Sequence, residues 1–174
     1  MSTLSDVSIH AQIEAGRLVI TPFDVAAVQP SSIDLRLGSL VRVARRDGSY
    51  IDYDLTERNG MWLYQADFAL AATLETVTLP DDLAGQLAGK STTARRGLIV
   101  ESAGFVDPAW SGELTLELTN LSPAPVWLSV GMGVCQLILT RLTTPCERPY
   151  GSDGLGSHYQ HSVGPVVPAR EARP

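Results

Sequence analysis

The segment SIDLRLGSLVRV, residues Ser32–Val43, decides the fold class, because apolar and polar side chains alternate along it. Ile33, Leu35 and Leu37 would share one face of an extended strand, and the residues between them are charged. Side chains of a β-strand point to opposite faces in turn, so this alternation predicts a half-buried strand.

Further short runs have the same β-like character, and Gly, Pro, Asn and Asp separate them. They are Ser49–Leu55, Phe68–Leu79, Gly112–Asn120, Ala124–Val130 and Cys135–Leu142. The 15 glycines and 11 prolines fit many turns. Many short strands of this kind predict an all-β sandwich or barrel. One short helix is expected over residues 5–16, with Ser5 as its cap and Gly16 as its stop.

Composition limits the classes of function. A chain of 174 residues with 44% hydrophobic and 18% charged residues is typical of one globular domain, here residues 1–174. The net charge of −6 argues against a general nucleic-acid binder, so an anionic ligand would need a local basic cluster. We expect no membrane span, since no apolar run approaches roughly 18 residues. The N-terminal residues lack a secretory-signal pattern, and the two isolated cysteines are expected to be free thiols in the cytoplasm.

The last residues, 163–174, are rich in proline and offer little to bury. One interpretation is a mobile C-terminal tail. The other is a flap that orders over a ligand. Composition favours the mobile tail.

The segment GKSTTARRG, residues Gly89–Gly97, interrupts the strand pattern with three cations and three hydroxyl side chains. In a short helix, Ser91 and Arg95 would lie on one face, and the helix start beside Lys90 would suit a phosphate group. A solvated basic turn is the plain alternative. A P-loop is excluded by spacing, since that motif needs a glycine where Ala84 stands.

The segment AGFVDPAWSGELTLELTN, residues Ala103–Asn120, joins a turn at Asp107-Pro108 to a regular strand. Leu114, Leu116 and Leu118 would face one side of it, and Glu117 the other. Such a carboxylate is usually solvated. If Glu117 lines a pocket instead, it is suited to moving protons.

Four segments together resemble the dCTP deaminases of the dUTPase-like superfamily. They are QPSSIDLRLG (Gln29–Gly38), TLETVTLPDDLAGQLAGKSTTARRGL (Thr73–Leu98), Ala103–Asn120 and PYGSDGLGSHYQ (Pro149–Gln160). The chain looks most similar to the bifunctional form that converts dCTP to dUMP. The resemblance implies a distorted β-barrel or jelly roll with a few short helices. It also implies a homotrimer with active sites between subunits and a magnesium-bound pyrimidine deoxynucleoside triphosphate.

The resemblance also assigns roles to individual residues. Glu117 matches the general base and acid that activates water for attack on C4 of cytosine, and Ser91 and Arg95 match residues that position that water. Among the matched substrate-binding residues, Lys90, Ser91 and Thr92 would hold the triphosphate in trans from a neighbouring subunit. Arg95 and Trp110 would lie near the base, and Asp107 at the 3′-hydroxyl. The remaining matched residues, in the closing C-terminal segment, are Tyr150, His158, Tyr159 and Ser162.

Zinc chemistry is not expected, because the zinc-deaminase signature H-x-E followed by P-C-x-x-C is missing. None of His10, His158 and His161 is followed by the required glutamate. Pro145-Cys146-Glu147-Arg148 begins the second half of the signature, but the second cysteine is missing, since Pro149 stands in its place. We therefore expect no protein-held metal, and Mg²⁺ only through the substrate phosphates.

The chain departs from the family pattern in two places. The loop Val100–Ala103 is one residue short and carries Glu101, which predicts altered base selectivity and weak inhibition by dTTP. His158 and Ser162 replace a lysine and a glutamine of the closing segment. Three functions stay open: a dCTP deaminase forming dUMP or dUTP, a paralogue acting on a modified or less phosphorylated pyrimidine nucleotide, and a non-catalytic nucleotide-binding regulator.

Overall fold

The computed structural model describes residues 2–100 and 104–168. Strands dominate this part of the chain, and each strand pairing within it is antiparallel. The strands are β1 Ser2–Thr3, β2 Val19–Thr21, β3 Val28–Gln29, β4 Ser32–Ala44, β5 Tyr50–Asp54, β6 Met61–Leu63, β7 Phe68–Thr78, β8 Leu83–Gly89, β9 Leu98–Val100, β10 Phe105–Val106, β11 Ser111–Asn120, β12 Val126–Leu128 and β13 Gly133–Arg141. The helical elements are α1 Asp6–Glu14, a 3-10 turn at Val25–Ala27, α2 Leu55–Arg58 and α3 Ser91–Ala94.

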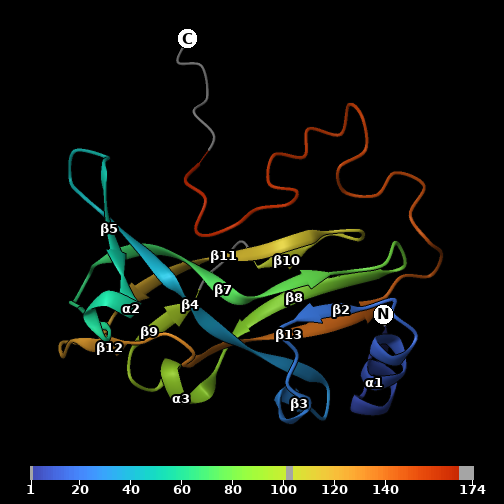
Figure 1. Cartoon of the computed structure of the whole chain (residues 1–174), viewed down its shortest axis with the longest axis horizontal. Coiled ribbons are helices and arrows are strands. Elements are labelled where there is room, and N and C mark those ends of the chain that lie inside the picture. Colours follow the sequence, from blue (N-terminus) through green and yellow to red (C-terminus); the bar gives the residue numbers. More distant parts are fainter. Residues whose placement is uncertain (1, 101–103, 169–174) are drawn as a thin grey trace.

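The long strand β4 joins the two halves of the main sheet (Figure 1). Its first part, from Ile33 to Arg36, pairs with β13, and its second part, from Leu37 to Val43, pairs with β7. The main path of the sheet runs β10-β8-β13-β4-β7-β11-β9, and β6 and β12 form a separate pair. The sheet therefore curls around one continuous cluster of buried apolar side chains. The predicted all-β fold, a distorted barrel with a few short helices, is confirmed.

The alternation that predicted β4 is confirmed by burial, since Ile33, Leu35 and Leu37 are all within the core. Burying the side chains of one strand face removes apolar surface from water and drives the sheet to close. At the N-terminus, α1 lies within the predicted helical range and the Ser5 side chain accepts the backbone N–H of Ser8. No helix in the described ranges is both long and apolar enough to cross a bilayer.

An irregularity interrupts the pairing of β7 with β11, although burial alternates without a break along β11. Pairing changes between Glu113, opposite Thr76, and Thr115, opposite Ala72. The buried Thr73 hydroxyl closes this gap, since it donates to the carbonyl of Glu75 at 2.7 Å and accepts the N–H of Leu114 at 3.0 Å. The additional residues lie on β7, so the outward positions of β11 continue in register to Glu117, opposite Leu70.

One strand is shorter than expected: the predicted run of residues 124–130 contains only β12, Val126–Leu128. Pro125 has no N–H to donate to a neighbouring strand. At the other end the chain turns at once, and the N–H of Met132 donates to the carbonyl of Ser129 at 3.3 Å.

Candidate active site

Strand β11 presents the carboxylate that the sequence singled out. Leu114, Leu116 and Leu118 are buried, whereas the alternate positions of the strand are half-buried. Glu117 is one of these half-buried positions, opposite Leu70 of β7. The strand pattern thus places a carboxylate at the boundary between core and solvent.

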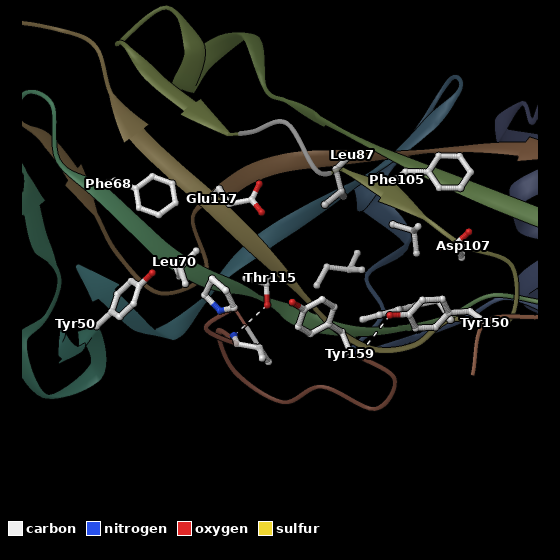
Figure 2. Close-up of a pocket in the computed structure, with 15 residues that line it drawn as sticks. Tyr50, Phe68, Leu70, Leu87, Phe105, Asp107, Thr115, Glu117, Tyr150 and Tyr159 are labelled. Carbon is white, nitrogen blue, oxygen red and sulfur yellow. Dashed lines mark hydrogen bonds between the residues drawn. The ribbon is translucent and has the colours of Figure 1, made fainter. Parts of the chain in front are cut away.

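Glu117 lines a cavity of about 440 Å³, which is within the usual size range of small-molecule sites. Figure 2 shows aromatic rings at both ends of it, Tyr50 and Phe68 at one and Phe105 and Tyr150 at the other. The remaining lining residues are Leu70, Leu87, Val106, Asp107, Trp110, Leu114, Thr115, Tyr159, Val166 and Pro168. A cavity of this kind can hold a flat ring against apolar walls and bring it to a carboxylate.

The turn before β11 supplies Asp107 and Trp110 to the cavity. The N–H of Trp110 donates to the carbonyl of Asp107 at 3.1 Å, and its indole N–H donates to the carbonyl of Gly112 at 3.2 Å. Trp110 is buried, and its ring centroid lies 5.5 Å from that of Tyr150. The second predicted carboxylate therefore sits on a turn that is fixed from both sides.

The segment after β13 closes the far side of the cavity. The N–H of Tyr159 donates to the hydroxyl of Tyr150 at 3.2 Å. The Gln160 side chain donates to the carbonyl of Ala109 at 2.8 Å and accepts the N–H of Ser111 at 3.1 Å. These bonds attach the C-terminal segment to the turn that carries Asp107 and Trp110.

The predicted cationic residues lie elsewhere in the protomer, on and beside α3. The N–H of Arg95 donates to the carbonyl of Ser91 at 3.0 Å, so the predicted helical turn is present. Ser91, Thr92 and Arg95 are exposed, and Lys90 pairs with Asp34 of β4. Arg95 contributes to a different cavity, between α3 and β12. Figure 1 shows α3 and the C-terminal segment on opposite sides of the sheet.

The structure thus brings together Asp107, Trp110, Glu117, Tyr150 and Tyr159 and leaves the α3 residues outside their cavity. His158 is exposed, with its ring centroid 6.1 Å from that of Tyr159, and the Ser162 hydroxyl donates to the carbonyl of Tyr159 at 2.6 Å. Neither is among the described lining residues. Most of the shortened loop, residues 101–103, is outside the described residues, so its expected effect on dTTP stays a prediction.

Sequence reasoning missed several residues that line the cavity: Tyr50, Phe68, Phe105, Thr115, Val166 and Pro168. Phe105 belongs to the quoted AGFVD segment, and its 61% exposure is a signal of a surface role. Tyr50 and Phe68 come from β5 and β7, far from Glu117 in the sequence. Only the pairing of strands brings them to the site.

In residues 2–100 and 104–168, no group of three or more His, Cys, Asp or Glu side chains could hold a metal ion. Both cysteines are free thiols, Cys135 buried and Cys146 half-buried.

The described chain is a curled antiparallel sheet with a cavity that contains carboxylate side chains, and comparison with known proteins identifies the family. A family model described as dCTP deaminase-like matches residues 3–142. The chain therefore belongs to the dCTP deaminase-like family, which confirms the resemblance.

Two relatives match almost the whole chain, and each is named a dUMP-forming dCTP deaminase. The protein from Mycolicibacterium vanbaalenii is 49% identical over 176 residues, which cover 94% of this chain and 93% of that protein. The protein from Streptomyces coelicolor is 49% identical over 177 residues, with the same coverage of 94% and 93%.

Solved structures share this fold. A 2′-deoxycytidine 5′-triphosphate deaminase from Agrobacterium tumefaciens superposes with a TM-score of 0.66 at 25% identity, over 79% of this chain and 47% of that one. The chain thus spans about half the length of that protein. A dUTPase from phage phi11 of S. aureus shares the fold with a TM-score of 0.50 at 15% identity, over 74% of this chain and 93% of that one.

Proposed function

We propose that this protein is a hydrolase that converts dCTP to dUMP, pyrophosphate and ammonia with two molecules of water. The observation that carries the proposal is the half-buried Glu117 in an aromatic cavity that also holds Asp107. The two relatives named as dUMP-forming dCTP deaminases support dUMP over dUTP as the product.

Glu117 would act first as a general base. Its carboxylate takes a proton from water, and the oxygen of that water attacks C4 of cytosine to give a tetrahedral centre. The glutamic acid then returns the proton to the departing amino group, which leaves as ammonia. A carboxylate placed within reach of both water and amine can perform both transfers.

Ser91 and Arg95 would assist from a neighbouring subunit. The charged side chains that line the described cavity are the carboxylates of Asp107 and Glu117, whereas Lys90, Arg95 and Arg96 cluster at α3. A triphosphate needs cationic donors, and guanidinium and ammonium groups bind phosphate oxygens well. We propose a homotrimer in which the exposed α3 of one protomer completes the cavity of the next, with Lys90, Ser91 and Thr92 at the triphosphate.

Other substrate contacts follow from the same arrangement. Asp107 would accept a hydrogen bond from the 3′-hydroxyl of the deoxyribose, and Trp110 would lie near the base. Tyr150 and Tyr159 would lie towards the phosphates, with His158 and Ser162 beside them. Magnesium would arrive as part of the substrate, bound to phosphate oxygens, which is its usual mode with nucleotides. The two free thiols support a reducing compartment, and we propose the cytoplasm.

Product analysis tests the reaction. Purified protein is incubated with Mg²⁺ and separately with dCTP, dUTP and dCMP, and ammonia and nucleotides are measured. We expect ammonia, dUMP and pyrophosphate from dCTP. Turnover confined to dCMP or another pyrimidine nucleotide would favour the paralogue reading, and nucleotide binding measured by calorimetry without any turnover would favour a regulator.

Subunit mixing tests the shared site. Glu117→Gln and Arg95→Ala are each expected to be inactive alone. When the two are co-expressed, roughly a quarter of the sites of a trimer receive both intact residues, so activity should return. An inactive mixture, shown to contain mixed trimers, would contradict a site formed between subunits.

A further inference from the structure

The C-terminal residues 159–168, here called the strap, follow β11 on its outward side. The N–H of His161 donates to the carbonyl of Ser111 at 2.7 Å, and the N–H of Glu113 donates to the carbonyl of Ser162 at 2.9 Å. Gly112 lies between these bonds, and a side chain there would come within 2.9 Å of the backbone nitrogen of Ser162. Glycine at this position therefore permits the strap to lie directly on the strand.

Beyond Ser162 the contacts change from backbone to side chain. The N–H of Gly164 donates to Oε2 of Glu113 at 2.7 Å, and the N–H of Val166 donates to the hydroxyl of Thr115 at 3.2 Å. Gly164 has a φ of +68°, a left-handed conformation that glycine adopts without strain. Pro165, between the two bonded residues, is buried. The carboxylate of Glu113 is thus the first side-chain acceptor that holds this part of the strap.

The strap reaches the cavity immediately after these contacts. Glu113, Thr115 and Glu117 occupy successive outward positions of β11, and the first two hold the backbone of the strap. Val166 and Pro168 then line the same cavity as Glu117. Figure 2 shows Thr115 with its dashed hydrogen bond to the strap, and Glu117 on the same strand. The position of this cavity wall depends on where the strap is attached.

We infer that Glu113 is a positioning residue for the proposed reaction, which this inference takes as given. Its carboxylate latches the strap along β11 so that Val166 and Pro168 form a wall of the Glu117 cavity. A wall that the protein itself holds in place reduces the ordering that a nucleotide must impose when it binds. Losing the latch should therefore weaken substrate retention more than the chemical step.

The test compares the full-length variants Glu113→Ala and Glu113→Gln. Alanine removes the acceptor, whereas the glutamine amide oxygen can still accept the N–H of Gly164. For Glu113→Ala we expect the KM for dCTP to rise about tenfold, as for one lost hydrogen bond to a charged group, with kcat changed less than about twofold. Glu113→Gln should restore most of the KM.

Hydrogen exchange measures how firmly Glu113 holds the strap, without any need for turnover. In Glu113→Ala, the backbone amides of Gly164 and Val166 should exchange about tenfold faster, because local opening costs less. Thr119→Ala is the matched control, since Thr119 has the same outward orientation further along β11. It should change neither exchange nor KM.

Two outcomes would overturn the inference: unchanged exchange in Glu113→Ala, or faster exchange with an unchanged KM. An equal loss in Glu113→Gln and Glu113→Ala would also overturn it, because the acceptor would then not be the cause. If the unmodified protein releases no ammonia from dCTP, the proposed function fails, and the exchange result still decides whether Glu113 holds the strap.

Discussion

The ammonium group of Lys90 is hydrogen-bonded to the carboxylate of Asp34, and this ion pair joins the start of α3 to β4. The side chains are only 23% and 21% exposed, and the alkyl stem of Lys90 lies over Gly133. Lys90 also accepts the N–H of Ala94 at 2.9 Å, through its carbonyl. The residue therefore fixes the turn that carries Ser91 and Arg95, in addition to the phosphate contact proposed for it.

Removing Lys90 should destabilise the protein more than removing the charge of Asp34. Asp34 is short and sits on a strand, so in Lys90→Met its carboxylate stays partly buried without its cation, at a cost of about 2 kcal/mol. In Asp34→Asn the long lysine can swing its ammonium into water, at a cost of about 1 kcal/mol or less. Urea unfolding of both variants measures the difference, and equal losses would contradict it.

Glu117→Gln should abolish turnover and leave binding intact. The amide keeps the shape and much of the hydrogen bonding of the carboxylate but cannot take a proton from water. Losing a general base typically lowers kcat by a factor of about 100 or more. The Kd for dCTP, measured by calorimetry, should stay within about threefold of the original, since the uncharged amide still fits the cavity.

The matched control for this variant is Glu113→Gln, the same change on the same face of the same strand. It should retain most of the activity, because its acceptor is preserved. A Glu117→Gln variant as active as the Glu113→Gln control would remove Glu117 from the mechanism.

Period-two patterning identified the strands that pack against the core, because burial alternates with the strand itself. This alternation predicted β4, β7, β11 and β13, and the cations and hydroxyl side chains of residues 89–97 predicted the turn of α3. It missed β8, whose residues LAGQLAG have little β-propensity. That strand exists because β13 and β10 pair with it on either side, which is a tertiary effect that local sequence does not contain.

The candidate site likewise contains residues that the sequence could single out and residues that only the folded chain reveals. Glu117 and Asp107 lie in recognisable segments, so the sequence could single them out. Glu113 resembles any other solvated carboxylate on a strand until its partner, Gly164, is known, and the two are 51 residues apart. Contacts over that separation depend on how the whole chain returns to β11, so periodicity could not predict the strap.

The ion pair between Arg36 and the buried Glu75 should contribute strongly to stability. Nε of Arg36 lies 2.6 Å from Oε1 of Glu75, and the backbone N–H of Arg36 donates to Oε2 at 2.9 Å. The Glu75 side chain is only 4% exposed. Arg36→Ala leaves that carboxylate buried without a cation, so we expect the free energy of unfolding to fall by about 3 kcal/mol.

The control for Arg36 is the pair of Arg42 and Asp52, in which the carboxylate side chain is 52% exposed and its oxygen lies 3.2 Å from Nε of Arg42. Arg42→Ala should cost less than about 1 kcal/mol, because water screens the pair. Urea denaturation of both variants checks the ranking. A loss in Arg36→Ala no larger than in Arg42→Ala would show that Glu75 finds other compensation.

Cys135 should give the stability of the protein a measurable dependence on alkaline pH. Burial, with help from the carboxylates of Glu75 and Asp34, raises the pKa of its thiol from an ordinary 9.0 to about 12. Below the ordinary pKa both folded and unfolded chains keep the proton. Between the two pKa values only the unfolded chain releases it, so rising pH favours unfolding, by at most about 1.4 kcal/mol per pH unit for this one group.

Comparison with Cys135→Ala isolates this contribution from the other groups that titrate at high pH. The difference in unfolding free energy between the original protein and the variant should shrink as the pH rises from about 9 to about 11, because only the original protein carries the thiol. Cys146→Ala, which changes the half-buried thiol, is the control. Parallel pH curves for the original protein and Cys135→Ala would mean that the Cys135 thiolate forms as easily in the folded chain as in the unfolded one, against the burial that the structure gives it.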